Sequence, residues 1–143
     1  MATIERILYD ISETALKNNH VNASYAGPSI YNLNGNTVVD YPYVFAAPTE
    51  DITVRENTTV VGLTLFYVDR LLADYSNEVD IFSVGVEVLK TLFKQIEGIE
   101  GVLDISQNPV IRLFTETQKM ADSCAGAYAR VYVTIINDCF DQR

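Results

Sequence analysis

Residues 58–68 read TTVVGLTLFYV, a run rich in β-branched and aromatic residues that predicts one long strand. Side chains alternate between the two faces of a strand. One face then carries Val61, Leu63, Leu65 and Tyr67, and the other carries Val60, Thr64, Phe66 and Val68. Both faces are partly apolar, which indicates a strand covered by helices on one side and by a neighbouring subunit or a second layer on the other.

The N-terminal segment predicts the first covering helix. Thr3 is the expected N-cap, and the helix is expected to run to about Asn18. Apolar residues recur along it at helical spacing: Ile4, Ile7, Leu8, Ile11 and Ala15. This pattern is typical of an amphipathic helix with one buried face.

A second, longer helix is predicted after Ser76-Asn77. Glu78 and Asp80 favour its positive N-terminus, and Gly98 is its expected stop, giving a helix of about 21 residues. One apolar row comprises Val79, Phe82, Val86, Leu89, Phe93 and Ile96, and a second comprises Ile81, Val84, Val88 and Leu92. Two rows predict a helix that is buried on more than one side.

The remaining segments complete an α+β pattern. Residues 19–36 read as a long loop with room for one short strand, and Ala46–Asp51 reads as a break in the strand pattern. Further strands are expected at Thr37–Phe45, with Pro42 marking an edge or bulge, then at Ile52–Arg55, Val102–Ile105, Val110–Thr117 and Ala125–Ile136. We therefore predict a single domain over residues 1–143. It is an antiparallel sheet with both helices packed on one face and a closing β-hairpin.

Composition narrows the functional class. The 143 residues are 48% hydrophobic and 20% charged, which is ordinary for a soluble globular domain. Glu5, Arg6 and Asp10 interrupt the apolar N-terminus, so we expect no secretory signal. The net charge of −9 disfavours wrapping nucleic acid, because such binding depends on Lys and Arg neutralising phosphates.

No sequence motif predicts a chemical site, and we expect no enzyme, no catalytic residue, no cofactor and no metal. His20 is the single histidine and is expected on the surface. Cys124 and Cys139 are expected to be small buried thiols. Two acidic groups, Glu97/Glu100/Asp104 and Asp138/Asp141, fall at helix and chain ends where solvated charge is the usual explanation.

Tyrosines and arginines on strand segments give a weaker signal for interfaces. The chain has nine tyrosines and no tryptophan. Those on strand segments are Tyr41, Tyr43, Tyr67, Tyr128 and Tyr132, and the strand-associated arginines are Arg55, Arg70, Arg112 and Arg130. Such tyrosines are either half-buried sheet residues or subunit contacts, and such arginines often pair with carboxylates across an interface.

The order of elements resembles the phage tail-terminator and head–tail connector (neck) ring proteins. The resemblance rests on the first strand beginning Tyr41-Pro42-Tyr43-Val44-Phe45, the strand Val60–Val68, a helix with Leu89-x-x-Leu92-Phe93, and a final strand containing Ala129-Arg130-Val131-Tyr132-Val133. It covers most of the chain and is mainly topological. The sequence also looks like a neck or tail component of crAss-like Bacteroides phage virions.

The resemblance implies a virion protein that forms a sixfold or twelvefold ring around the DNA channel. Its partners would be copies of itself, portal-side or adjacent ring proteins, and tail tube or hub proteins, with DNA passing through without specific binding. Residues 19–36 and Ala46–Asn57 would be arms that reach neighbours, and the negative charge would repel passing phosphates. The alternatives are a non-viral oligomeric adaptor and a small ligand-binding domain or enzyme.

Overall fold

The computed structural model of the chain describes residues 3–27, 30, 40–117 and 122–136. The elements in chain order are α1 (Thr3–Ala15), β1 (Ala23–Ala26), β2 (Tyr43–Val54), β3 (Thr58–Arg70), α3 (Glu78–Glu97), β4 (Val102–Ile105), β5 (Ile111–Glu116) and β6 (Cys124–Ile136). The predicted α+β class is confirmed, as is the closing hairpin of β5 and β6.

One six-stranded sheet runs through the molecule in the order β1-β2-β3-β6-β4, and β5 also pairs with β6. β4 and β5 therefore follow one another along the outer edge of β6. The central strands β3 and β6 are antiparallel and paired over thirteen residues, from Thr58 opposite Ile136 to Arg70 opposite Cys124. β1 joins β2 in parallel, so the sheet is mixed and only mostly antiparallel.

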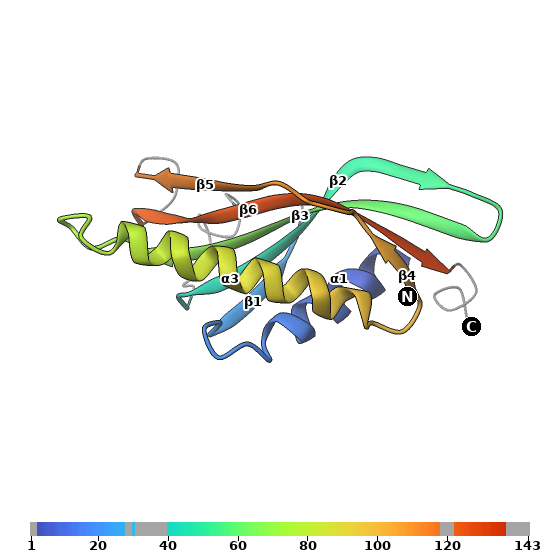
Figure 1. The fold of residues 1–143 in the computed structure, drawn as a ribbon, viewed down its shortest axis with the longest axis horizontal. Coiled ribbons are helices and arrows are strands. Elements are labelled where there is room, and N and C mark those ends of the chain that lie inside the picture. The colour runs from blue at the N-terminus through green and yellow to red at the C-terminus, as the bar shows by residue number, and fades with distance from the viewer. Residues whose placement is uncertain (1–2, 28–29, 31–39, 118–121, 137–143) are drawn as a thin grey trace.

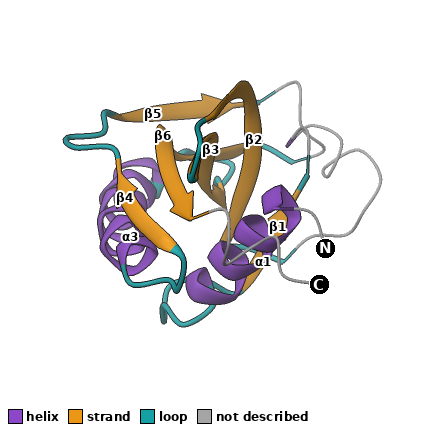
Figure 2. Cartoon of the chain, turned by 90° about the vertical axis from the view of Figure 1, so that its right-hand side faces the viewer, coloured by secondary structure: helices purple, strands orange, loops and turns teal. Residues whose placement is uncertain are grey.

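Both helices pack against the same face of the sheet, as predicted (Figures 1 and 2). The odd-numbered residues of β3 and β6 point toward the helices, and most of them, among them Leu63, Leu65 and Val131, are fully buried. They meet Ile7 and Ile11 of α1 and the inward residues of α3. Alternation of side chains along each strand thus directs one continuous apolar surface against the helices.

The opposite face of the sheet is divided into two halves. At one half, Tyr43, Phe45, Val68 and Cys124 form a second buried cluster together with Ile30. The other half carries Thr64, Arg112 and Arg130 and is open to solvent in the described part of the chain. In the described part of the chain, the apolar residues of this face are therefore buried over the first half, and the second half is exposed.

The orientation of α3 differs from the prediction. Its buried residues are Ile81, Gly85, Val88, Leu89, Leu92 and Ile96. The core face therefore combines Ile81, Val88 and Leu92 of the predicted second row with Leu89 and Ile96 of the first row, while Val79 of the first row is 71% exposed. Because the two rows are offset around the helix axis, only one stripe can face a single sheet.

The segments preceding β3 also differ from the prediction. β2 continues through Ala46–Asp51, where a break was expected, because a register shift between Pro48 and Ile52 accommodates the irregular residues within the strand. Pro48 is the register partner of Leu63 of β3, but β1 pairs only with Tyr43–Ala46, so β2 has no paired strand on its other side at Pro48 and proline is tolerated there. The expected strand residues Thr37–Val39 lie outside the described residues.

Two helix boundaries can be compared with the prediction. α1 ends at Ala15 and is followed by turns, so it stops short of Asn18. Gly98 caps α3 as expected, and its N–H donates to the Gln95 carbonyl. Among the described residues, no helix has both the length and the apolar character needed to cross a membrane.

Gly85 allows α3 to approach the sheet closely. A Cβ at this position would lie 3.0 Å from Cδ2 of Tyr67 and 3.2 Å from Cβ of Ala127. Both neighbours are in the fully buried core, so they have little room to move. The small residue therefore sets the distance between α3 and the central strands.

We expect Gly85→Val to lower the free energy of unfolding by about 1–3 kcal/mol, because added methyl groups overpack this contact. The measurement is urea denaturation followed by circular dichroism. Lys94→Val is the matched control, since Lys94 is exposed on the same helix and should change stability by less than about 0.5 kcal/mol. Equal stability of the two variants would show that the close approach is unimportant.

Candidate interaction surfaces

The β2–β3 hairpin ends in an exposed, partly apolar tip. Residues 51–57 are all exposed, and Val54 has 76% of its surface accessible. Ile52 lies two residues before Val54 on the same side of β2 and is exposed as well. Figure 1 shows the hairpin projecting beyond α3 at one end of the longest axis of the molecule. We call residues 51–57 the hairpin tip.

The base of the tip is held by a close backbone contact. A Cβ at Gly62 would overlap the Thr49 hydroxyl and lie 3.0 Å from the Asp51 carbonyl oxygen. The Tyr132 hydroxyl donates a hydrogen bond to Asp51 Oδ2 at 3.2 Å. The irregular part of β2 therefore lies directly over β3 and is tied to β6, which gives the tip a defined direction.

An apolar hollow lies between the first turns of α3 and β5. α3 begins at the end of the molecule opposite to the hairpin tip (Figure 1). The hollow has a volume of about 500 Å³ and is lined by Val79, Phe82, Val86 and Leu113, with Glu87 at its border. Leu113 is 51% exposed. The Thr115 hydroxyl donates to Glu78 Oε2 at 2.7 Å and joins the two walls. We call this the α3–β5 hollow.

A second hollow of about 500 Å³ lies on the open half of the sheet, on the face away from the helices. Its floor includes Thr64, Tyr128 and Tyr132, and its charged groups are Arg112 and Arg130. The loop of residues 106–110, which joins β4 to β5, forms one wall. We call this the arginine hollow.

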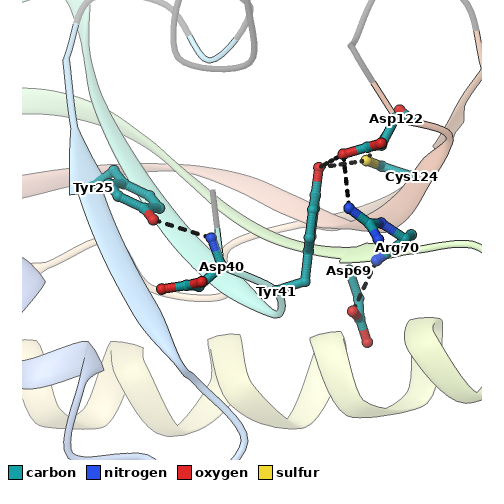
Figure 3. A network of polar contacts seen from close by, with 7 residues as sticks. All are labelled: Tyr25, Asp40, Tyr41, Asp69, Arg70, Asp122 and Cys124. Carbon is teal, nitrogen blue, oxygen red and sulfur yellow. Dashed lines mark hydrogen bonds and ion pairs between the residues drawn. The ribbon is translucent and has the colours of Figure 1, made fainter. Parts of the chain in front are cut away.

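A polar network closes the sheet at the end of β3 (Figure 3). Asp122 Oδ2 accepts hydrogen bonds from the Tyr41 hydroxyl and from Arg70, each at 3.1 Å. The Arg70 guanidinium also lies over the Tyr41 ring, 5.1 Å from its centroid. This network links the segment before β2 to β3 and to the start of β6.

Cys124 belongs to the same network and is a buried thiol, as predicted. Its Sγ donates to the Tyr41 hydroxyl oxygen at 3.5 Å and to the Asp122 carbonyl oxygen at 3.3 Å. Burial raises the pKa of the Cys124 thiol and, more strongly, that of the Tyr41 hydroxyl. Both groups therefore stay protonated at neutral pH, and Cys124 lacks the thiolate that a nucleophile needs.

The other candidates for chemistry are scattered over the described residues. His20 is exposed, and its backbone N–H donates to Asn18 Oδ1 at 2.9 Å. Glu97, Glu100 and Asp104 are exposed, and no group of three potential metal ligands occurs in the described part of the chain. Cys139, Asp138 and Asp141 lie outside the described residues.

The tyrosines divide between core and surface. Tyr43 and Tyr67 are completely buried, Tyr41 and Tyr128 are half-buried, and Tyr132 is exposed. The half-buried interpretation therefore holds for only part of the set. Among the described tyrosines, Tyr128 and Tyr132 line the arginine hollow.

The arginines occupy three different settings. Arg70 pairs with Asp122 of the same chain, and Arg55 is exposed in the hairpin tip. Arg112 and Arg130 converge on the arginine hollow, and neither forms an ion pair with any described residue. Sequence patterns singled out these residues individually. They did not indicate that two of them share one face, or that Val79 and Leu113 share a hollow.

Asp69 gives a testable dependence of stability on pH. Burial raises the pKa of this carboxyl, and the backbone N–H of Arg70, at 2.8 Å, only partly offsets that effect. A carboxyl with a raised pKa in the folded state favours folding below its unfolded pKa and loses this contribution as pH rises through the folded pKa. At neutral pH the ionised Asp69 therefore disfavours the folded state.

We expect Asp69→Asn to unfold at higher urea concentration than the unaltered chain at pH 7, because the amide removes the buried charge. The difference should vanish as pH falls below the ordinary carboxyl value of 3.8. Asp74→Asn is the control, and it should unfold at lower urea concentration than the unaltered chain at pH 7, because hydrogen bonds from Ser76 lower the pKa of Asp74. A less stable Asp69→Asn variant at pH 7 would contradict the assignment.

Comparison with known proteins adds no relative. No protein-family model matches the chain, and no curated protein matches it.

Proposed function

We propose that this chain is a structural virion protein that forms a ring in the neck or tail of a phage. The observation that carries the proposal is the presence of two exposed apolar surfaces, the hairpin tip and the α3–β5 hollow, at opposite ends of the molecule. The resemblance of the element order to tail-terminator and neck proteins supports the same reading.

Two different surfaces at opposite ends favour head-to-tail association. In such a heterologous contact one patch meets a different patch on the next copy, and repetition closes a ring when the rotation between copies is right. The tip offers Ile52 and Val54, and the hollow offers Val79, Phe82 and Leu113. Each of these apolar surfaces is a liability in a lone monomer and becomes useful once covered.

The hairpin tip and the α3–β5 hollow also carry charges of opposite sign. Arg55 is exposed in the hairpin tip, and Glu87 borders the α3–β5 hollow. Among the described residues, the ion-pair partner of Glu87 is the exposed Lys90, at 3.4 Å. Charges of opposite sign at the border of an apolar contact set its register and speed its formation more than they add affinity.

The proposed ring surrounds the channel through which the genome passes. Its partners are further copies of the chain, portal-side or adjacent ring proteins, and tail tube or hub proteins, with six or twelve copies as the resemblance implies. The net charge of −9 suits a channel wall, since it repels phosphates and prevents DNA from sticking. The role requires no chemical reaction.

The first test is the mass of the purified chain by light scattering across a concentration series, with negative-stain images of the large species. We expect a discrete multiple of the monomer mass and closed particles with a central hole. A chain that stays monomeric at every concentration, alone and with portal and tail proteins, would contradict the proposal. Open filaments without closed rings would support association but not a ring.

Single substitutions in the hairpin tip and in the α3–β5 hollow should both weaken self-association. We expect Val54→Asp and Val79→Asp each to weaken self-association at least about tenfold, because each places a charge in the apolar contact. Val79 is in the first turn of α3, where an acidic residue suits the helix and should not harm folding. The measurement is the concentration at which half of the chain is assembled.

The matched controls are Thr53→Asp, on the opposite side of the same strand, and Thr91→Asp, exposed on α3. Both should assemble as the unaltered chain does. Arg55→Glu should weaken assembly, and adding Glu87→Arg in the same chain should restore it. If the double variant Arg55→Glu/Glu87→Arg melts at a normal temperature but does not regain assembly, the hairpin tip and the α3–β5 hollow do not contact one another.

A further inference from the structure

The arginine hollow is distinct from both ends of the molecule. It lies on the sheet face away from the helices, next to the outer edge of β6 where β4 and β5 are joined. The hairpin tip and the α3–β5 hollow lie at the two ends of the longest axis (Figure 1), and neither shares a lining residue with the arginine hollow. A ligand bound in the arginine hollow would therefore use different residues from those proposed for self-association.

The two guanidinium groups are placed to act on one ligand. Arg112 of β5 is the register partner of Tyr128, and Arg130 is two residues further along β6 on the same face. Diagonal neighbours of this kind have Cα atoms about 7–8 Å apart. Two flexible side chains at that separation can both reach a single carboxylate or two successive ones.

The surroundings leave both charges available. Neither arginine forms an ion pair with a described residue. Asp51 engages the Tyr132 hydroxyl instead, at 3.2 Å, and Asp104 is exposed on β4. Only ten Lys and Arg residues accompany nineteen Asp and Glu residues in the chain, so two unpaired arginines in one hollow are a marked local excess of positive charge.

The walls of the hollow are suited to a peptide. Tyr128, Tyr132, Pro109 and Val110 contribute aromatic and apolar surface beside the guanidinium groups. The wall loop is fixed to β6 by Ser106, whose Oγ accepts the Tyr132 N–H at 2.7 Å and whose own N–H donates to the Tyr132 carbonyl at 3.0 Å. A preformed site of this kind costs little ordering on binding.

We propose that the arginine hollow binds an acidic, extended peptide segment of a different protein, with Arg112 and Arg130 receiving its carboxylates. Arginine matches a carboxylate with two parallel hydrogen bonds, and the tyrosine rings pack against the rest of the segment. A nucleic acid is disfavoured because its affinity depends on neutralising many phosphates, whereas this hollow offers two arginines. The proposal does not depend on the ring, since it concerns a separate face.

The test uses the full chain and a fluorescent, end-blocked hexaglutamate peptide, with binding followed by anisotropy at low salt. We expect saturable binding that weakens at least about tenfold in the double variant Arg112→Gln/Arg130→Gln, equivalent to about 1.4 kcal/mol. The double variant Arg112→Lys/Arg130→Lys keeps the positive charge but loses the paired N–H donors of the guanidinium groups. Its affinity for the peptide should lie between those of the unaltered chain and the Gln double variant. Exposed arginines tolerate these changes, which unchanged melting temperatures will verify.

Arg55→Gln is the matched control, because it removes one exposed arginine outside the hollow and should change binding less than about twofold. Absence of peptide binding, or equal loss in the control, would overturn the proposal. Tighter binding of a six-nucleotide single-stranded DNA than of hexaglutamate would assign the site to nucleic acid. Loss of self-association in the Gln double variant would assign it to a second copy, and both of these results would refute the proposal.

Discussion

The unbroken pairing of β3 with β6 is the constraint on which the other features depend. Thirteen consecutive register pairs determine which side chains face the helices and which face away. A slip of one residue would move Leu63, Leu65 and Val131 from the core to solvent. The same register places Thr64 opposite Arg130, so the arrangement that builds the core also builds the floor of the arginine hollow.

The exposed apolar ends follow from a mismatch in length between the two layers. β2 and β3 extend beyond α3, as Figure 1 shows, so the side of the hairpin that is buried at Leu63 continues outward without a helix to cover it. Ile52 and Val54 lie on that continuation, with Ile52 opposite Val61 and Val54 opposite Thr59. At the other end, α3 begins with Val79 turned away from the sheet. The hairpin tip thus extends the core face of the sheet beyond the helix, whereas the α3–β5 hollow is formed by outer residues of α3 together with Leu113.

Sequence patterns predicted the type of each element better than they predicted how the strands pair. The period of two in residues 58–68 and the helical periods of α1 and α3 were sufficient for element type, for the α+β class and for helices on one face. The break expected at Ala46–Asp51 was wrong, because a bulge can absorb Pro48 inside a strand. The parallel pairing of β1 was missed, since a strand of four residues carries no signal for its direction.

The surfaces were predicted only in part, for a related reason. The region Ala46–Asn57 was proposed as an arm, and the hairpin tip lies within it. The two rows of α3 were read as burial on two sides, whereas the outer residues Val79, Phe82 and Val86 line an open hollow with Leu113. Periodicity shows which face of a helix or strand is apolar, but it does not show whether other residues of the same chain bury that face. Arg112 and Arg130 line the same hollow because of the register between β5 and β6, and register cannot be predicted from a local sequence pattern.

The outer borders of the sheet consist of short strands and, beyond the end of β1, of the irregular second part of β2. β1 and β4 have four residues each and β5 has six, whereas β3 and β6 have thirteen. A long, flat border of unpaired backbone groups would let copies add to one another indefinitely and form fibrous aggregates. The loop between β4 and β5 and the irregularity in β2 interrupt such a template on both sides. These interruptions protect the chain from edge-to-edge aggregation and leave its side-chain surfaces as the places where specific contacts can form.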